Sequence, residues 1–172
     1  MANLRLASKL QEDSIVDGPG VRMVLWTQGC LHGCPRCHNP QTHDVNGGIM
    51  VATQDIIKQM QEAKLQTGLT LSGGEPFLQS KELLAIAIEA KNLKLNIWAY
   101  TGFTYEQIIA NPDQKALLEQ LDVLVDGKYM EAQKDYRLLF KGSKNQRIID
   151  VQASLQQGCV ILSTYDQQNE LQ

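Results

Sequence analysis

The sequence predicts an α/β fold, and three observations carry that prediction. Short apolar runs alternate with helical stretches of about a dozen residues. Within those stretches apolar side chains recur at the spacing of one helix face. Polar or glycine-rich sequence follows four of the apolar runs. Strands joined by helices pair in parallel, and a parallel sheet binds its ligand at the carboxyl ends of its strands. We therefore expect these four segments to meet at one rim.

Each expected element has a local signal. Apolar runs predict strands at 21–27, 68–72, 94–100 and 121–125, with later candidates at 147–151 and 159–162. Helices are predicted at 53–64 and at 80–91, the second capped by Ser80. Thr104 and Gln107 match a capping box for a short helix, and Asn111 precedes another with Pro112 at its first position.

Length and charge exclude several classes of protein. The chain has 172 residues, which suit one domain, 1–172, and a net charge of −3. That charge gives no sign of nucleic-acid binding, because such proteins are usually basic. No apolar run approaches the ~18 residues of a membrane span. The first residues lack the apolar stretch of a signal peptide, so we expect a cytoplasmic protein.

The cysteines are unevenly distributed. Cys30, Cys34 and Cys37 follow the first strand with the spacing C-x₃-C-x₂-C, within a cluster loop at about 28–40. Thiolates suit zinc or an iron–sulfur cluster. Zinc would need a fourth ligand, for which His32, His38 and His43 are candidates. An iron–sulfur cube held by three cysteines would leave one iron open to a substrate or cofactor. Cys159 lies in an apolar run, so we expect it to be buried and outside this group.

Several motifs carry a family resemblance. The cysteine motif after one strand and Gly73-Gly-Glu-Pro76 after the next resemble the radical S-adenosylmethionine (SAM) superfamily. Asp17-Gly-Pro-Gly-Val-Arg22 resembles the activating enzymes of glycyl-radical enzymes. The stretches 125–129, 140–143 and 145–150 are similar to one branch, the anaerobic ribonucleoside-triphosphate reductase activating proteins. The resemblance runs from about residue 14 to about residue 151.

The resemblance implies a fold and a chemistry. The fold would be a parallel (β/α) barrel of the radical SAM type, and an incomplete one, because a full barrel needs about 250 residues. Cys30, Cys34 and Cys37 would hold a 4Fe–4S cluster whose open iron binds SAM. Reductive cleavage of SAM would give methionine and a 5′-deoxyadenosyl radical, which would remove hydrogen from a glycine of the partner reductase. A flavodoxin- or ferredoxin-type protein would supply the electron.

The resemblance also implies contacts to SAM. Gly73, Gly74, Glu75 and Pro76 match the SAM-contacting motif, in which glycines let a ligand approach the backbone closely and Glu75 can accept from the SAM ammonium group. Arg36, Cys37 and His38 would contact the cofactor through backbone atoms. Arg36 stands where the superfamily often has an aromatic residue near the adenine. An ordinary strand-to-helix turn is the alternative for the glycine motif, and a solvated loop residue is the alternative for His38.

Two further corners match the pattern of related activases. Tyr100 and Thr101 match a SAM-contacting corner, although Ala99 stands where some activases carry an acidic residue. Lys128 would pair with the SAM carboxylate, and Asp126 would help to bind a cation, unless both lie in a solvated turn. Arg22 and the string Asn145-Gln-Arg147 have no role that can be derived from sequence. We expect the C-terminal part of the chain, about 140–172, to face the partner.

Three functions compete. The leading hypothesis is a radical SAM oxidoreductase that generates a glycyl radical on the anaerobic ribonucleoside-triphosphate reductase. A second keeps the chemistry but changes the substrate, to another glycyl-radical enzyme of the pyruvate formate-lyase type or to a small molecule of deazapurine synthesis. The third is not an enzyme: a zinc-stapled binding module, which zinc would help to fold. Metal content and SAM cleavage without oxygen would distinguish them.

Overall fold

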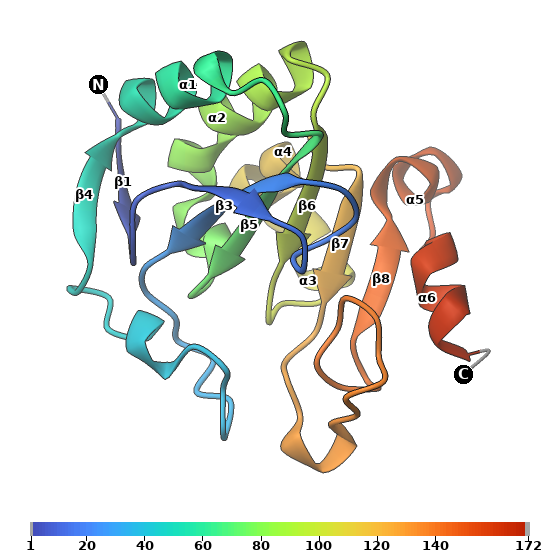
Figure 1. The fold of residues 1–172 in the computed structure, drawn as a ribbon. Coiled ribbons are helices and arrows are strands. Elements are labelled where there is room, and N and C mark those ends of the chain that lie inside the picture. The colour runs from blue at the N-terminus through green and yellow to red at the C-terminus, as the bar shows by residue number, and fades with distance from the viewer. Residues whose placement is uncertain (1, 171–172) are drawn as a thin grey trace.

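The computed structural model describes residues 2–170, and its main feature is one sheet with mixed strand directions (Figure 1). Four strands run parallel in the middle of the sheet: β3 (Arg22–Thr27), β5 (Gly68–Gly73), β6 (Asn96–Tyr100) and β7 (Val123–Asp126). Antiparallel strands flank them: β1 (Asn3–Leu6), β2 (Gln11–Ser14), β4 (Ile49–Ala52) and β8 (Arg147–Asp150).

The sheet is open within the described residues. Its strand order is β4-β1-β3-β5-β6-β7-β8, with β2 pairing beside β3, so β4 and β8 lie at opposite ends and do not pair with each other. The expected α/β fold with parallel central strands is confirmed, whereas the incomplete barrel that was also expected is not, because the sheet stays open. The antiparallel flanks explain the difference, because β1, β4 and β8 extend the sheet at its two edges without the helical crossovers that parallel units need.

Four helices cover one face of the sheet. On the covered face lie α1 (Thr53–Glu62), α2 (Ser80–Asn92), α3 (Tyr105–Ile109) and α4 (Pro112–Leu118), which bury a single large apolar core against the strands. The opposite face carries a smaller aromatic group around Trp98, with Phe140 and Tyr165 packed against it. The last helices, α5 (Val151–Gln157) and α6 (Thr164–Glu170), follow β8 (Figure 1).

Capping signals in the sequence predict most helix starts correctly. The capping box of Thr104 and Gln107 begins α3, and the Asn111 side chain accepts bonds from the first backbone amides of α4. The cap expected at Ser80 is wrong, because a 3₁₀ turn, Pro76–Gln79, precedes α2 and supplies its first turn instead. No helix in the described part of the chain is long and apolar enough to cross a bilayer.

The region around Cys159 differs from expectation. Residues 159–162 do not form a strand, since only Leu162 bridges to Ile149 of β8. Gly158 ends α5 in the left-handed conformation, with φ of +71°, and turns the chain at the surface. Cys159 is therefore exposed and not buried. The apolar composition of residues 159–162 fits a strand, but the end of α5 and its cap at Gly158 set the direction of the chain there.

Candidate functional site

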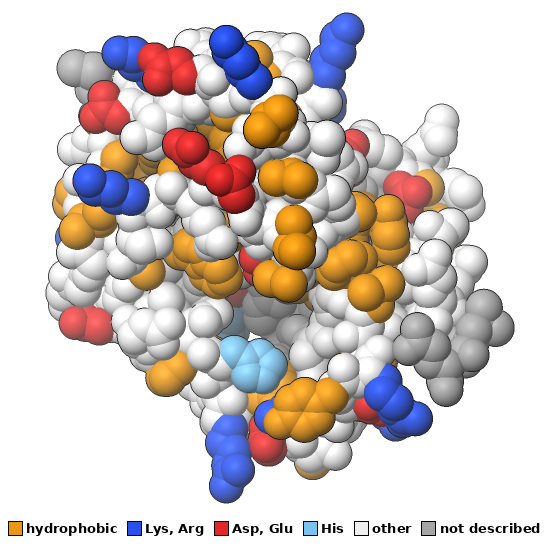
Figure 2. Space-filling view, viewed as in Figure 1, with side chains coloured by type: hydrophobic (Ala, Val, Ile, Leu, Met, Phe, Trp, Pro, Cys, Tyr) orange, Lys and Arg blue, Asp and Glu red, His pale blue; other side chains and the backbone are white. Residues whose placement is uncertain are grey.

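The four segments that follow the parallel strands meet at one cavity, as expected. The cavity has a volume of about 470 Å³, and residues after β3, β5, β6 and β7 line it. Its position follows from the parallel registers, which bring the carboxyl ends of the four strands to the same edge. Figure 2 shows this face hollowed, with histidine at the edge of the hollow and apolar side chains gathered around it.

The three clustered thiols share this cavity. Cys30, Cys34 and Cys37 all line it, each partly exposed and none in a disulfide. Two backbone bonds turn the loop: the Cys37 amide donates to the Cys34 carbonyl at 3.2 Å, and the Gly29 amide donates to the Thr42 carbonyl at 2.8 Å. Burial raises the pKa of the Cys30 thiol above its ordinary value.

The thiols do not converge on one point. Within residues 2–170, no three Cys, His, Asp or Glu side chains are close enough to bind a single metal ion. A polynuclear iron–sulfur cluster offers a separate iron to each cysteine, so it fits three thiols that line one cavity. The donors are three soft sulfur atoms, and no second group of cysteines lines the cavity. Both facts also suit such a cluster.

Gly73 and Gly74 form the second wall. A Cβ on Gly73, where φ is +99°, would lie 2.5 Å from the backbone of Thr27. A Cβ on Gly74 would lie 2.4 Å from the Gly29 carbonyl oxygen. The Gly74 and Glu75 amides donate to the carbonyls of Thr27 and Gly29, both at 2.8 Å. Only glycine allows these two loops to lie this close, which places the cysteine loop directly against the end of β5.

Glu75 lies beneath the cavity and does not line it. Its side chain is completely buried and each carboxylate oxygen accepts two bonds. The donors come from three corners: His32 Nε2 at 2.6 Å, Thr101 Oγ1 at 2.8 Å, and the amides of Phe77 at 3.0 Å and Gly102 at 2.8 Å. In this structure Glu75 therefore holds the cysteine loop and the ends of β5 and β6 together.

The remaining expected residues divide into two groups. His38, Tyr100 and Thr101 line the cavity, as do the three thiols and both glycines. Pro76 is buried in the 3₁₀ turn before α2. Arg36 and Lys128 are exposed and are absent from the cavity lining. Asp126 is also outside the lining, because its buried carboxylate binds Arg147 Nε at 3.0 Å and Nη2 at 2.5 Å.

Three consecutive side chains fix the corner after β7. Arg147 binds the Asp126 carboxylate, Gln146 donates to the Gly127 carbonyl at 3.0 Å, and Asn145 donates to the Lys128 carbonyl at 2.8 Å. These pairs continue the antiparallel register of β7 and β8 beyond the last strand pair, Asp126 and Arg147. The Asn145-Gln-Arg147 string thus acts as a side-chain clamp on this corner.

Arg22 also has a structural role. Its guanidinium is buried and donates to Thr70 Oγ1 at 2.7 Å, to the Leu69 carbonyl at 2.9 Å and to the Asn96 carbonyl at 2.7 Å. Burial lowers the pKa of Arg22 to about 10. A further bond, 3.1 Å to the Pro19 carbonyl, ties the Asp17-Gly-Pro-Gly segment to β5 and β6.

Sequence reasoning missed several cavity residues. Asp17 and Tyr129 lie in the recognised stretches 17–22 and 125–129, and the stretches 140–143 and 145–150 contain Phe140, Lys141, Gly142 and Gln146, so all six were within reach of the motif argument. Val16 and Trp26 also line the cavity, and no motif marks them.

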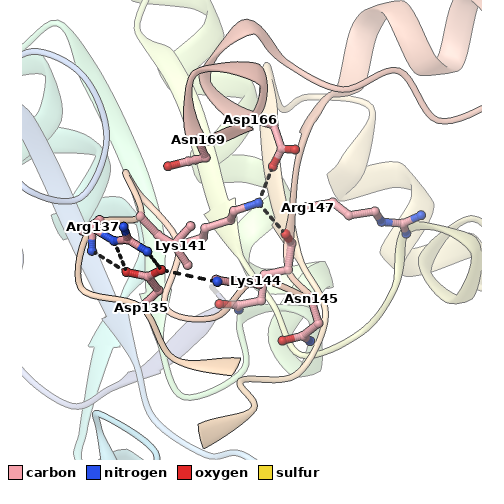
Figure 3. Close-up of a pocket in the computed structure, with 10 residues that line it drawn as sticks. Asp135, Arg137, Lys141, Lys144, Asn145, Arg147, Asp166 and Asn169 are labelled. Atoms are coloured by element: carbon pink, nitrogen blue, oxygen red, sulfur yellow. Dashed lines mark hydrogen bonds and ion pairs between the residues drawn. The ribbon is translucent and has the colours of Figure 1, made fainter. Parts of the chain in front are cut away.

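A second cavity, of about 390 Å³, adjoins the first (Figure 3). Lys141 and Gln146 line both cavities. The Lys141 ammonium is almost fully buried and donates to Asp166 Oδ1 at 2.8 Å and to the Gln146 carbonyl at 3.0 Å. Arg137 and Lys144 both pair with Asp135 at the edge. The Lys141–Asp166 pair therefore fastens α6 to the loop that walls the first cavity.

Comparison with known proteins agrees with this geometry. Residues 16–149 match the model of the 4Fe-4S single cluster domain. The chain belongs to this family, whose cofactor is a 4Fe–4S cluster. An activating protein of anaerobic ribonucleoside-triphosphate reductase from Haemophilus influenzae is 34% identical over 142 residues, 78% of this chain and 90% of the relative. Those from Escherichia coli K12 and phage T4 are 36% and 35% identical over 140 residues, covering 90% and 86% of their lengths and 77% of this chain.

Within that domain family, the chain is a member of the anaerobic ribonucleoside-triphosphate reductase-activating proteins. The recognition made from the cysteine and glycine motifs is thereby confirmed. Among solved structures, QueE from Escherichia coli overlaps 59% of this chain and 53% of its own, with a TM-score of 0.49 and 14% identity.

Proposed function

We propose that this chain activates an anaerobic ribonucleoside-triphosphate reductase by generating a glycyl radical on it, with SAM as the consumed co-substrate. The observation that carries the proposal is the single cavity of about 470 Å³ lined by Cys30, Cys34, Cys37, Gly73 and Gly74. The names of the relatives supply the partner. The cluster, when reduced, supplies one electron for the cleavage of SAM, and a flavodoxin- or ferredoxin-type protein supplies that electron.

The residues of the chain have separate tasks in this proposal. The three thiolates hold the cluster on a loop that Glu75 and His32 tie to the ends of β5 and β6. Gly73 and Gly74 leave the backbone bare, so a small ligand can approach the strand ends closely. Tyr100 and Thr101 close the adjoining wall. The buried core lies on the opposite side of the sheet, so the site rests on a rigid support.

We assign the sheet to the incomplete barrel type expected of a radical SAM domain. The support is the arrangement of β3, β5, β6 and β7, which are parallel and end at the cavity. The open edges would leave room for a loop of a partner protein to reach the cavity.

The test uses protein reconstituted with iron and sulfide under exclusion of oxygen. We expect a 4Fe–4S cluster, release of 5′-deoxyadenosine on reduction with SAM, and an organic radical signal on added reductase. Cys30→Ser should abolish both the release of 5′-deoxyadenosine and the radical signal on the reductase. Cys159→Ser is the matched control and should retain them, because Cys159 is exposed and outside the cavity. A colourless protein with one bound zinc, or radical formation only on pyruvate formate-lyase, would contradict the proposal.

A further inference from the structure

The Arg36 side chain does not line the cavity, although it stands where the superfamily often has an aromatic residue. Its side chain is 80% exposed and is absent from the lining residues. The backbone of Arg36 has φ of +55°, a left-handed conformation. The residue before Cys37 therefore makes no contact inside the cavity.

Tyr129 lies beside the cysteine loop. Its ring lies against His38, the residue after Cys37, with 4.6 Å between ring centroids and a tilt of 48°. Both rings line the cavity. The other Phe, Tyr and Trp residues of the lining have partners elsewhere: Phe140 packs edge-on against Trp98 at 5.3 Å, Tyr100 packs against the same group, and Trp26 Nε1 donates to Gln11 at 2.8 Å. Tyr129 is the lining aromatic that contacts the cysteine loop.

The backbone on both sides of Tyr129 is fixed. Asn145 Nδ2 donates to the carbonyl of the preceding residue, Lys128, at 2.8 Å. The amide of the following residue, Met130, donates to Ser143 Oγ at 3.1 Å. Ser143 and Asn145 are also bonded to each other, at 2.7 Å. The clamp on the corner after β7 therefore sets the direction in which Tyr129 leaves the chain.

The ring itself is also held. Its hydroxyl donates to the carboxylate of Glu131, and Arg36 Nη1 lies 3.9 Å from that same carboxylate. A Cβ on Gly142 would lie 3.1 Å from both Tyr129 Cδ2 and His38 Cε1, so glycine at this position leaves room for both rings. Arg36 thus contacts the group that orients Tyr129.

We propose that Tyr129 provides the aromatic contact for the adenine of SAM, with Glu131, Ser143 and Asn145 as residues that position it. This inference rests on the proposed function, because it requires SAM to bind in this cavity. An adenine has two flat faces, and stacking on an aromatic side chain is its most general mode of recognition. The charged end of SAM needs polar partners, and polar side chains such as Ser72 and Thr101 also line the cavity.

The test measures binding, separately from turnover. S-adenosylhomocysteine, which is not cleaved, and free methionine, which lacks the adenosyl group, are titrated into anaerobically reconstituted protein. Tyr129→Leu should weaken S-adenosylhomocysteine binding by about 5- to 150-fold, the range for loss of one stacked base, and leave methionine binding unchanged. Tyr129→Phe should restore most of the affinity. Tyr136→Leu is the control, because Tyr136 is 89% exposed and outside the lining.

Three results would overturn the inference. The first is an affinity of Tyr129→Leu for S-adenosylhomocysteine within twofold of wild type. The second is an equal loss of methionine affinity, and the third is failure of Tyr129→Phe to restore binding. Failure of the wild-type holoprotein to bind S-adenosylhomocysteine would instead refute the proposed function. Cluster absorbance measured on each variant separates loss of the cluster from loss of the ring.

Discussion

The ion pair between Arg147 and Asp126 allows a quantitative prediction. The Asp126 carboxylate is 1% exposed, and Arg147 is its only cationic partner among the described residues. Arg147→Met keeps the aliphatic stem but leaves the carboxylate buried without a counter-charge. Breaking a buried pair in this way costs about 3–5 kcal/mol. We expect the lower end, about 3 kcal/mol, because a third of the Arg147 side chain is exposed and water can enter.

Urea denaturation of the cluster-free protein, followed by circular dichroism, measures the loss of unfolding free energy. A loss of about 3 kcal/mol corresponds to a fall in Tm of about 6–12 °C for a chain of this size. Asp126→Asn added to Arg147→Met should recover part of the loss, because it removes the unpaired charge but keeps an acceptor for the Tyr105 amide, 2.8 Å away.

The control is an exposed ion pair on α4. Lys115 and Glu119 are 3.9 Å apart and both 48% exposed. Lys115→Met should change the free energy of unfolding by less than about 0.5 kcal/mol. Two results would contradict this role of the ion pair. One is a loss of unfolding free energy in Arg147→Met no larger than that in Lys115→Met. The other is a double variant, Arg147→Met with Asp126→Asn, that is less stable than Arg147→Met alone.

Three further predictions concern stability and cluster loading. The bond from Arg147 lowers the pKa of Glu106 from 4.5 to about 2, so its stabilising effect is complete above about pH 4.5 and disappears as the pH falls toward 2. Glu106→Gln should therefore flatten the stability profile in that window in urea titrations, and an unchanged profile would contradict this. Gly74→Ala should lower the iron bound per chain and destabilise the fold by more than ~1 kcal/mol, since its Cβ would meet the Gly29 carbonyl oxygen at 2.4 Å; normal iron content would argue against the close approach. Arg22→Met should cost about 2–6 kcal/mol, because the Leu69 and Asn96 carbonyls lose a buried donor, and denaturation midpoints equal to wild type would disprove that role.

The central strands and the meeting of four loops could be predicted because both depend on local pattern and on one general rule. Apolar runs such as 121–125 identify strands by composition alone, and parallel pairing then brings their carboxyl ends to one edge. Among the flanking strands, β8 was predicted in this way from the run 147–151, whereas β1, β2 and β4 were not. β2 has the polar sequence Gln-Glu-Asp-Ser, exposed except at Ser14, and it is a strand only because β3 offers it a paired edge.

The direction of individual side chains was beyond reach of the sequence for a related reason. Glu75 turns inward because donors from three separate corners converge on its carboxylate. Those donors are brought together only by the completed sheet. Similarly, Asn145, Gln146 and Arg147 match the residues they bind through the register of β7 and β8, which no local pattern encodes.

The clamp after β7 also separates two parts of the molecule that can change independently. Because Asp126, Gly127 and Lys128 are bonded to Arg147, Gln146 and Asn145, both ends of the intervening segment are anchored at the cavity. Insertions near its far end, around Tyr136, would lengthen an exposed loop without moving that anchor. The outer contour presented to other proteins can therefore be rebuilt while the wall beside the thiols keeps its shape.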